Sequence, residues 1–319
     1  MTLSIVFLDR DTLRPETRLR PPEVPHTLVE HDRTAPEEVA GRIAEADVVV
    51  LNKVAIGARE LAAAKRLKLI VVAATGTDKI DAAACANAGV TVCNVREYAT
   101  TTVPEHTFAL MLALRRSLVP YRQSTIDGRW EDAGQFCYFD YPIADLAGSR
   151  LGIVGDGSLG RAVGRIGEAF GMEVLFSAYK GVDGMGPLYT PFDEVMATAD
   201  VITLHCPLMP ATRHMISDRE FGLMARRPLL INTARGGLVD EAALERALEA
   251  GRISGAGFDV ATTEPPGADH VMRCLAARDD VILTPHVAWA STGAVQAVAD
   301  QVTDMIEAFA RGHPINVVR

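Results

Sequence analysis

Three polar side chains in the second half of the chain have the types that reduction of a carbonyl would need. Arg235 stands in Asn-Thr-Ala-Arg-Gly-Gly, Glu264 in Asp-Val-Ala-Thr-Thr-Glu-Pro-Pro, and His286 in Leu-Thr-Pro-His-Val-Ala-Trp. Each follows a short apolar run that predicts a strand, and open α/β sheets gather ligands at the carboxyl ends of their strands. A histidine can supply a proton near neutral pH, a carboxylate can stabilise the charged ring, and an arginine keeps its charge beside an oxygen that becomes negative.

A glycine-rich loop upstream predicts a nucleotide site. Residues 155–160 read Gly-Asp-Gly-Ser-Leu-Gly and lie between an expected strand, 151–154, and an expected helix, 159–170. The dinucleotide fingerprint requires this setting. Backbone N–H groups of Ser158 and Leu159 are expected to meet the pyrophosphate, and Gly155, Gly157 and Gly160 would allow its close approach. A nucleotide loop followed by an arginine, a carboxylate and a histidine predicts hydride transfer to a 2-oxo acid.

Each of these side chains also has an ordinary structural interpretation when it is taken alone. Arg235 could order a loop, Glu264 could be a solvated carboxylate, and His286 could be a core or surface histidine. Their order along the chain, each at a strand end, favours catalysis. We expect His205, at another strand end, to line the cofactor or to pack, and His106, on a long helical segment, to be structural.

Strands and helices alternate along almost the whole chain, which predicts an α/β protein with parallel sheets covered on both faces. In the first third we expect strands at 4–8, 27–30, 47–51, 69–73 and 90–93, with helices at 36–46 and 59–66. Later strands are expected at 151–154, 174–177, 200–204, 229–232, 255–259 and 281–284. We therefore predict two doubly wound parallel-sheet domains, a dinucleotide-binding Rossmann domain and a flavodoxin-like substrate domain, with the active site in the cleft between them.

Two long helical patterns set the expected domain boundaries. One covers about 103–128 and leads into an aromatic-rich loop, 130–142; the other covers about 292–311 and is expected to pack back on the first domain. We predict a discontinuous substrate domain, residues 1–101 plus 288–319, and a nucleotide-binding domain, residues 102–287.

The composition limits the class of function. A chain of 319 residues with 48% hydrophobic content can bury two cores, and a formal charge of −9 argues against a nucleic-acid partner. Five scattered cysteines, without any Cys-x-x-Cys, indicate a reduced cytoplasmic protein. No stretch approaches the roughly 20 apolar residues of a membrane span, so we expect no membrane anchor and no signal peptide. No cluster of His, Cys and carboxylates has metal-ligand spacing, so we expect no metal site.

The ordered motifs resemble the D-isomer-specific 2-hydroxyacid dehydrogenase family over nearly the full length, from Thr75-Gly76-Thr77-Asp78 to the terminal Gly-His-Pro-Ile-Asn. Lys53 in Asn-Lys-Val, the loop 136–139 and Trp289, three residues after the histidine, resemble the branch of glyoxylate and hydroxypyruvate reductases, also called glycerate dehydrogenases. The resemblance implies hydroxypyruvate or glyoxylate as substrate, NAD(P)H as cofactor and a homodimer in which the long helix and its loop embrace the partner.

The resemblance also implies roles for single residues. His286 would be the proton donor, Glu264 its charge partner, and Arg235 the contact to the substrate. The turn of Thr75, Gly76 and Thr77 would hold the substrate carboxylate, since glycine lets backbone N–H groups face an anion. Lys53 and Trp289 would contact the rest of the substrate. The further expected cofactor contacts are Val103, Cys206, Pro207, Thr212, Thr233, Ala234 and Asp259.

The choice between NAD and NADP is open in the sequence. An NAD site usually has an acid about 20 residues beyond the glycines, but the expected strand at 174–177 is followed by Ala178-Tyr179-Lys180. Without a carboxylate there, a 2′-phosphate meets no repulsion, and Lys180 could pair with it. The segment partly resembles the Ser-Arg-Ser-Lys of NADPH-preferring reductases, with Ala178 in place of the arginine. We therefore lean to NADP(H).

Two other functions stay open. One is a dehydrogenase for a bulkier 2-oxo acid, because motif spacing does not report pocket volume. The other is a nucleotide-sensing binding protein like the corepressors that share this fold. The complete set of Arg235, Glu264 and His286 favours an enzyme.

Overall fold

The chain forms two compact units in the computed structural model, which describes residues 2–318. One unit comprises Met1–Ala99 with Ala290–Arg319, and the other comprises Thr100–Trp289. Both are built on parallel sheets. The first unit is therefore assembled from the two ends of the chain.

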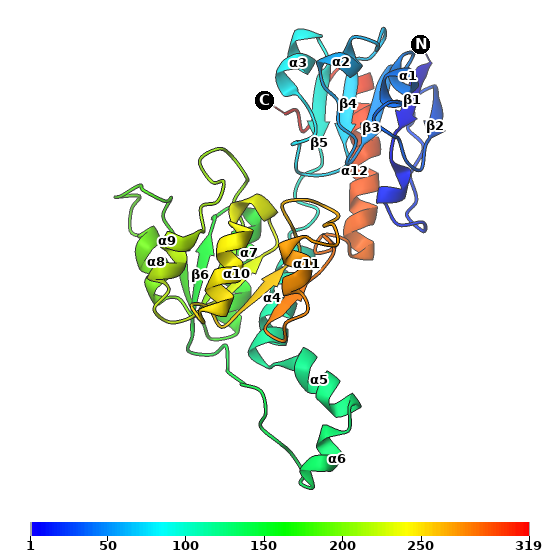
Figure 1. Ribbon diagram of the computed structural model, residues 1–319. Helices are drawn as coiled ribbons and strands as arrows, with labels where there is room; N and C mark the ends of the chain where they lie inside the picture. Colours follow the sequence, from blue (N-terminus) through cyan, green and yellow to red (C-terminus); the bar gives the residue numbers. More distant parts are fainter. Residues whose placement is uncertain (1, 319) are drawn as a thin grey trace. The chain divides into compact units, whose positions relative to one another are not determined.

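The first unit holds a five-stranded sheet in the order β2-β1-β3-β4-β5, the flavodoxin-like order (Figure 1). Its strands are β1 Leu3–Phe7, β2 His26–Glu30, β3 Val48–Leu51, β4 Leu69–Val72 and β5 Thr91–Asn94. Its helices are η1 Arg10–Thr12, α1 Val39–Ile43, α2 Ala58–Leu61, α3 Ala82–Asn87 and α12 Thr292–Ala310. Every residue of β3 and β4 is buried, because parallel strands are covered on both faces. The C-terminal helix α12 packs against β4.

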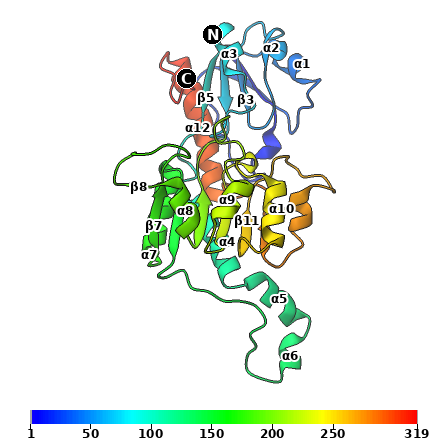
Figure 2. The same ribbon diagram turned by 60° about the vertical axis from the view of Figure 1, so that its left-hand side comes forward.

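The second unit holds a seven-stranded sheet in the order β12-β11-β10-β9-β6-β7-β8. Its strands β7, β8 and β11 are labelled in Figure 2. Its strands are β6 Arg150–Val154, β7 Glu173–Ser177, β8 Tyr189–Thr190, β9 Val201–Leu204, β10 Leu229–Asn232, β11 Gly255–Phe258 and β12 Val281–Leu283. Its helices are α4 Thr102–Arg115, α5 Leu118–Ile126, α6 Arg129–Ala133, α7 Ser158–Ala169, α8 Phe192–Thr198, α9 Asp218–Leu223, η2 Gly236–Leu238, α10 Glu241–Glu249 and α11 Val271–Leu275. The strand order reverses between β6 and β9, where open sheets of this kind bind ligands. The predicted class of two doubly wound parallel sheets is confirmed.

Some predicted elements have different bounds. The single helix expected at 103–128 is two helices, because Arg116 and Ser117 interrupt it and Ser117 has φ of 48°. A continuous helix would place Pro120 in its interior, whereas the break puts Pro120 in the first turn of α5, where no hydrogen bond is lost. Trp130, expected in a loop, lies in α6. The two-residue edge strand β8 was not predicted, and α1 and α2 are shorter than expected.

Candidate active site

His286 and Glu264 form a hydrogen-bonded pair. The imidazole Nδ1 lies 2.7 Å from Glu264 Oε2, and the two side chains are 26% and 36% exposed. His286 follows β12 with φ of 54°, and its backbone N–H donates to the carbonyls of Asp259 and Thr284. A carboxylate on Nδ1 orients the ring and stabilises its protonated form, so the pair can serve as a general acid.

Asp259 fixes the backbone on both sides of His286. Its side chain is 1% exposed and accepts hydrogen bonds from the Thr284 hydroxyl and from the backbone N–H groups of Val287 and Ala288. The Trp289 indole donates to the His286 carbonyl at 3.0 Å. Asp259 was predicted only as a cofactor contact; its role in anchoring the histidine loop was missed, because nothing in the sequence shows which N–H groups a buried carboxylate meets.

Arg235 lies in the turn that follows β10. Its backbone is extended, its Nη1 donates to the Ala234 carbonyl at 2.7 Å, and Asn232 ties the turn through both ends of its amide. The next residue, Gly236, packs directly on the loop that leads to Glu264: a Cβ there would lie 2.1 Å from the Ala261 carbonyl carbon. The arginine turn and the glutamate loop are therefore in backbone contact, which only glycine allows.

The glycine-rich loop has the packing and the open space that a pyrophosphate needs. Gly155 has φ of 105°, and a Cβ there would lie 2.7 Å from the His205 carbonyl carbon. A Cβ on Gly160 would lie 1.9 Å from the Gly155 oxygen, so these two glycines close the turn. A Cβ on Gly157, by contrast, would meet nothing within 4 Å, and Gly157 caps the N-terminus of α7. The turn leaves the start of the helix open to an anion.

His205 supplies an unsatisfied polar atom beside this loop. Its Nε2 lies 2.9 Å from the Thr203 hydroxyl, while its Nδ1 is buried without a hydrogen-bond partner among the described residues. Burial lowers the pKa of His205 to about 4, so the ring is neutral near pH 7. An orphaned ring nitrogen at the carboxyl end of β9 fits a ligand that carries hydrogen-bonding groups.

The comparisons with known proteins decide the family. The model described as "D-isomer specific 2-hydroxyacid dehydrogenase, NAD binding domain" matches residues 108–288. A glycerate dehydrogenase of Methylorubrum extorquens is 50% identical over 319 residues, which cover 100% of this chain and 99% of that protein. The chain belongs to the D-isomer specific 2-hydroxyacid dehydrogenase family.

Other relatives agree with this membership. A hydroxypyruvate reductase of Blautia hydrogenotrophica is 33% identical to the dehydrogenase described here, over 99% of both proteins. An NADPH-dependent glyoxylate/hydroxypyruvate reductase of Sinorhizobium meliloti, solved with NADP and malonate, shares 28% identity with a TM-score of 0.84 over 99% of this chain and 96% of that one. The family resemblance predicted from the sequence, to the glycerate dehydrogenase branch, is confirmed. The chain is a nicotinamide-dependent oxidoreductase that acts on CH–OH donors.

The predicted cofactor residues of the dehydrogenase fall into two groups. Around β10, the Thr233 hydroxyl lies 3.1 Å from that of Thr107, whose side chain also donates to the carbonyl of the buried Val103. After β9, the Thr212 hydroxyl donates to the Pro207 carbonyl and accepts from the Met209 N–H, so it holds its own loop in shape. Burial raises the pKa of the neighbouring Cys206 thiol to about 11, which keeps it protonated.

Lys180 of the dehydrogenase already has strong partners. Its Nζ lies 2.8 Å from the buried Glu220 carboxylate and donates to the Met215 carbonyl at 2.9 Å. Arg219 binds the same carboxylate at 2.8 Å. Although burial opposes its charge, Lys180 and Arg219 hold the pKa of Glu220 below its ordinary value. Two cations share one buried carboxylate at this site.

The predicted substrate residues of the first unit lie in two ordered turns. After β4, the Thr75 hydroxyl donates to the Val95 carbonyl, and the Asn94 amide donates to the Thr75 carbonyl at 2.7 Å. After β3, the Asp9 carboxylate accepts the backbone N–H groups of Asn52, Lys53 and Val54. Burial raises the pKa of Asp9, and these three donors oppose the rise. Asp9 was missed, although a buried acid at the end of the first strand is a detectable signal.

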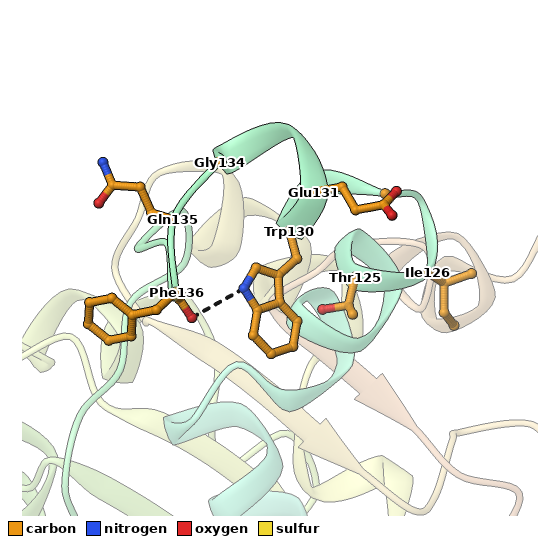
Figure 3. Close-up of a pocket in the computed structure, with 8 residues that line it drawn as sticks. Thr125, Ile126, Trp130, Glu131, Gly134, Gln135 and Phe136 are labelled. Carbon is orange, nitrogen blue, oxygen red and sulfur yellow. Dashed lines mark hydrogen bonds between the residues drawn. The ribbon is translucent and has the colours of Figure 1, made fainter.

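A surface hollow of about 750 Å³ lies on the segment formed by α5, α6 and the following chain, far in sequence from Glu264 and His286 (Figure 3). The Trp130 indole, one of the residues that line it, donates to the Phe136 carbonyl at 3.2 Å. α5 and α6 extend away from the rest of their unit (Figures 1 and 2). On the chain that follows α6, Phe136 and Phe139 are 87% and 84% exposed.

Neither a metal site nor a membrane-spanning helix is present within residues 2–318. No group of three or more His, Cys, Asp or Glu residues there could hold a metal ion. No helix in this part of the chain is long and apolar enough to span a membrane.

Proposed function

We propose that the dehydrogenase reduces a small 2-oxo acid, with hydroxypyruvate and glyoxylate as the first candidates, to the D-2-hydroxy acid, and that His286 donates the proton. The observation that supports this most is the 2.7 Å contact between His286 Nδ1 and Glu264 Oε2. Because Glu264 occupies Nδ1, the proton for the substrate oxygen comes from Nε2. The nicotinamide cofactor, when bound, supplies the hydride.

The remaining residues orient the substrate. In the proposal, the planar guanidinium of Arg235 binds the substrate beside its carbonyl, where negative charge develops. The substrate carboxylate is assigned to the Thr75-Gly76-Thr77 turn of the first unit, whose shape the Thr75 and Asn94 hydrogen bonds maintain. Lys53 and Trp289 are assigned to the distal end of the substrate.

The proposed substrates follow from the chemistry of the site and from the relatives. The proteins named glycerate dehydrogenase and hydroxypyruvate reductase match this chain over its whole length. Hydroxypyruvate and glyoxylate are small, anionic 2-oxo acids, and the proposed site offers an arginine and a backbone turn for such an anion.

We propose NADP(H) as the preferred cofactor because of the turn that follows β7. No carboxylate follows β7 in Ala178-Tyr179-Lys180, so a 2′-phosphate meets no repulsion from this turn. Lys180 offers less charge to a 2′-phosphate than the sequence suggests, because the Glu220 carboxylate already compensates part of the lysine's charge. The preference is accordingly proposed to be modest.

We further propose a cytoplasmic homodimer. The five cysteines are free, as in reduced proteins of the cytoplasm. The exposed Phe136 and Phe139 on the protruding segment offer apolar surface of the kind that subunit interfaces bury.

A steady-state assay of the purified protein tests this function. Hydroxypyruvate, glyoxylate and a bulkier 2-oxo acid, 2-oxoisocaproate, are each reduced with NADH and with NADPH, and product chirality is measured. We expect higher kcat/KM for the two small acids, a D-product where the product is chiral, and a several-fold preference for NADPH. An NADH preference would overturn only the cofactor choice. Turnover of none of the acids despite nucleotide binding would favour a sensing protein over an enzyme.

A further inference from the structure

We propose that Glu241 is a positioning residue that fixes the loop carrying Glu264. The inference rests on the proposed function, because it assumes that the Glu264 and His286 pair transfers the proton. Glu241 belongs to none of the motifs singled out in the sequence. Its hydrogen-bonded link to the pair of Glu264 and His286 runs through Thr262.

The loop that carries Glu264 needs an external anchor. Residues 259–264 follow β11 without helix or strand structure, and Thr262, Thr263 and Glu264 are exposed. Within the loop, the Ala261 N–H donates to Glu264 Oε1 at 3.1 Å. This contact keeps the loop compact, but it does not fix the loop relative to the sheet.

Glu241 provides that anchor with both carboxylate oxygens. Oε1 accepts the Thr262 N–H and Oε2 accepts the Thr262 hydroxyl, each at 2.7 Å. Glu241 is the first residue of α10 and only 7% exposed, and Asp240 caps the helix by accepting from the Ala243 N–H. A carboxylate at a helix N-terminus is favoured by the helix dipole, which offsets part of the cost of burial.

His270 completes the network from the other side. Its Nδ1 accepts the Met272 N–H at the start of α11, so the neutral ring carries its proton on Nε2. That nitrogen lies 3.3 Å from the Thr262 hydroxyl and 3.4 Å from Glu241 Oε2. The Thr262 hydroxyl can therefore donate to Glu241 and accept from His270. Thr262 thus links the starts of α10 and α11 to the loop that carries Glu264.

The network lies two residues from the catalytic pair. Thr262 and Glu264 are separated by one residue, so a displacement of Thr262 is transmitted along a short stretch of bent backbone to Glu264, whose other oxygen contacts His286 at 2.7 Å. Hydrogen bonds weaken steeply with distance and angle, so a shift of about 1 Å would weaken the hold on the imidazole. Glu264 contacts this imidazole directly, and Asp259 accepts the backbone N–H groups of the next two residues.

The test compares Glu241→Ala and Thr262→Val with Glu249→Ala, an exposed glutamate at the other end of α10. We expect kcat for hydroxypyruvate to fall about tenfold in the first two variants, with KM changed less than twofold. The loss is therefore in kcat rather than in KM, as in Glu264→Gln. Glu241→Gln, whose amide can still hold both Thr262 groups, recovers most of the rate. Glu249→Ala behaves as wild type.

The double variant Glu241→Ala with Glu264→Gln separates positioning from stability. If Glu241 acts through Glu264, the double variant is no slower than Glu264→Gln alone. If the double variant loses the product of the two single rate losses, the positioning role of Glu241 is overturned. It is also overturned if Glu241→Ala lowers Tm but leaves kcat at the wild-type value. Because Thr262 lies in an exposed loop, Thr262→Val tests the same link should Glu241→Ala fail to fold. Absence of hydroxypyruvate turnover in the wild type would overturn the proposed function itself. A Glu264→Gln enzyme with unchanged kcat would overturn the role of the pair on which this inference rests. An impaired Glu264→Gln beside unaffected Glu241→Ala and Thr262→Val overturns only this inference.

Discussion

At the scale of single residues, the site depends on which atom each polar group already holds. Glu264 contacts one nitrogen of His286, and Asp259 accepts from the backbone that follows it. Lys180 is ion-paired with Glu220. The first two contacts favour proton transfer, and the third reduces the charge available to a cofactor phosphate. The residue types alone suggest these functions, but the contacts show which side chains are still available for them.

Replacement of Glu264 by glutamine should remove the charge partner of His286 and keep the shape of its side chain. We expect kcat to fall about tenfold to a hundredfold, since positioned acid–base partners contribute rate factors of this order. KM should change less than twofold, because Glu264 is assigned to the imidazole and not to the substrate. The measurement is steady-state kcat and KM for hydroxypyruvate. An unchanged kcat would show that Glu264 does not act on the proton donor.

His205 makes a separate prediction about stability. Its pKa is lowered to about 4 by burial, from an ordinary value of 6.5. Between these two pH values the unfolded chain binds a proton that the folded chain does not. The contribution of the neutral His205 ring to the free energy of unfolding is therefore complete above pH 6.5 and is lost as the pH falls toward 4. Between pH 7 and pH 5, wild type should lose about 2 kcal/mol more free energy of unfolding than His205→Gln. Urea unfolding at both values measures this. Equal losses would show that His205 titrates normally.

At the scale of elements, the site is made of turns that follow parallel strands. Arg235 follows β10, Glu264 lies in the loop after β11, and His286 follows β12. These three strands are neighbours in the sheet, so their carboxyl ends deliver the three side chains to one edge. The packing of Gly236 on Ala261 then fixes two of these turns against each other.

Replacement of Gly236 by alanine should disturb both turns at once. The added Cβ would lie 2.1 Å from the Ala261 carbonyl carbon and 2.4 Å from the Thr262 nitrogen, so the backbone must move. We expect a loss of about 2–3 kcal/mol in unfolding free energy and a large fall in kcat. Gly267→Ala is the matched control, because a Cβ there meets nothing within 4 Å. Wild-type activity in Gly236→Ala would contradict the proposed link between the turns.

Much of this arrangement could be predicted from the sequence. Buried parallel strands such as β3 and β4 appear as continuous apolar runs, and Gly155 to Gly160 mark the first turn of the nucleotide site. The break at Ser117 was missed because the apolar spacing continues across it, and the meaning of Pro120 depends on where the helix restarts. Glu241 was missed for another reason: it binds the backbone N–H and the hydroxyl of Thr262, 21 residues away, which no local pattern encodes. Asp9 could have been noticed as an acid directly after the first strand, although its partners at 52–54 could not be predicted.

At the scale of the whole molecule, the two units and the protruding segment have different tasks. The glycine loop and the catalytic pair belong to the second unit, and the Thr75 and Lys53 turns belong to the first. The segment with α5 and α6 carries strongly exposed aromatic side chains. Its proposed task is to join two copies of the chain.

The joint replacement of Phe136 and Phe139 by serine should weaken the proposed dimer. Both side chains are more than four-fifths exposed in the single chain, so their loss costs the isolated fold little. We expect wild type to sediment as a dimer at micromolar concentration and the variant to shift toward monomer. Ile315→Ser, which changes an exposed apolar residue of the other unit, should leave the dimer intact. A monomeric wild type would refute the dimer.

The most direct test of the account is a single-turnover measurement on His286→Asn. The enzyme is loaded with NADPH, mixed with hydroxypyruvate, and nucleotide oxidation is followed by absorbance, while NADPH affinity is measured by fluorescence titration. The account predicts a rate at least about a thousandfold below wild type, with nucleotide affinity changed less than twofold, because removal of the proton donor leaves binding intact. A rate within tenfold of wild type would show that His286 is not the proton donor.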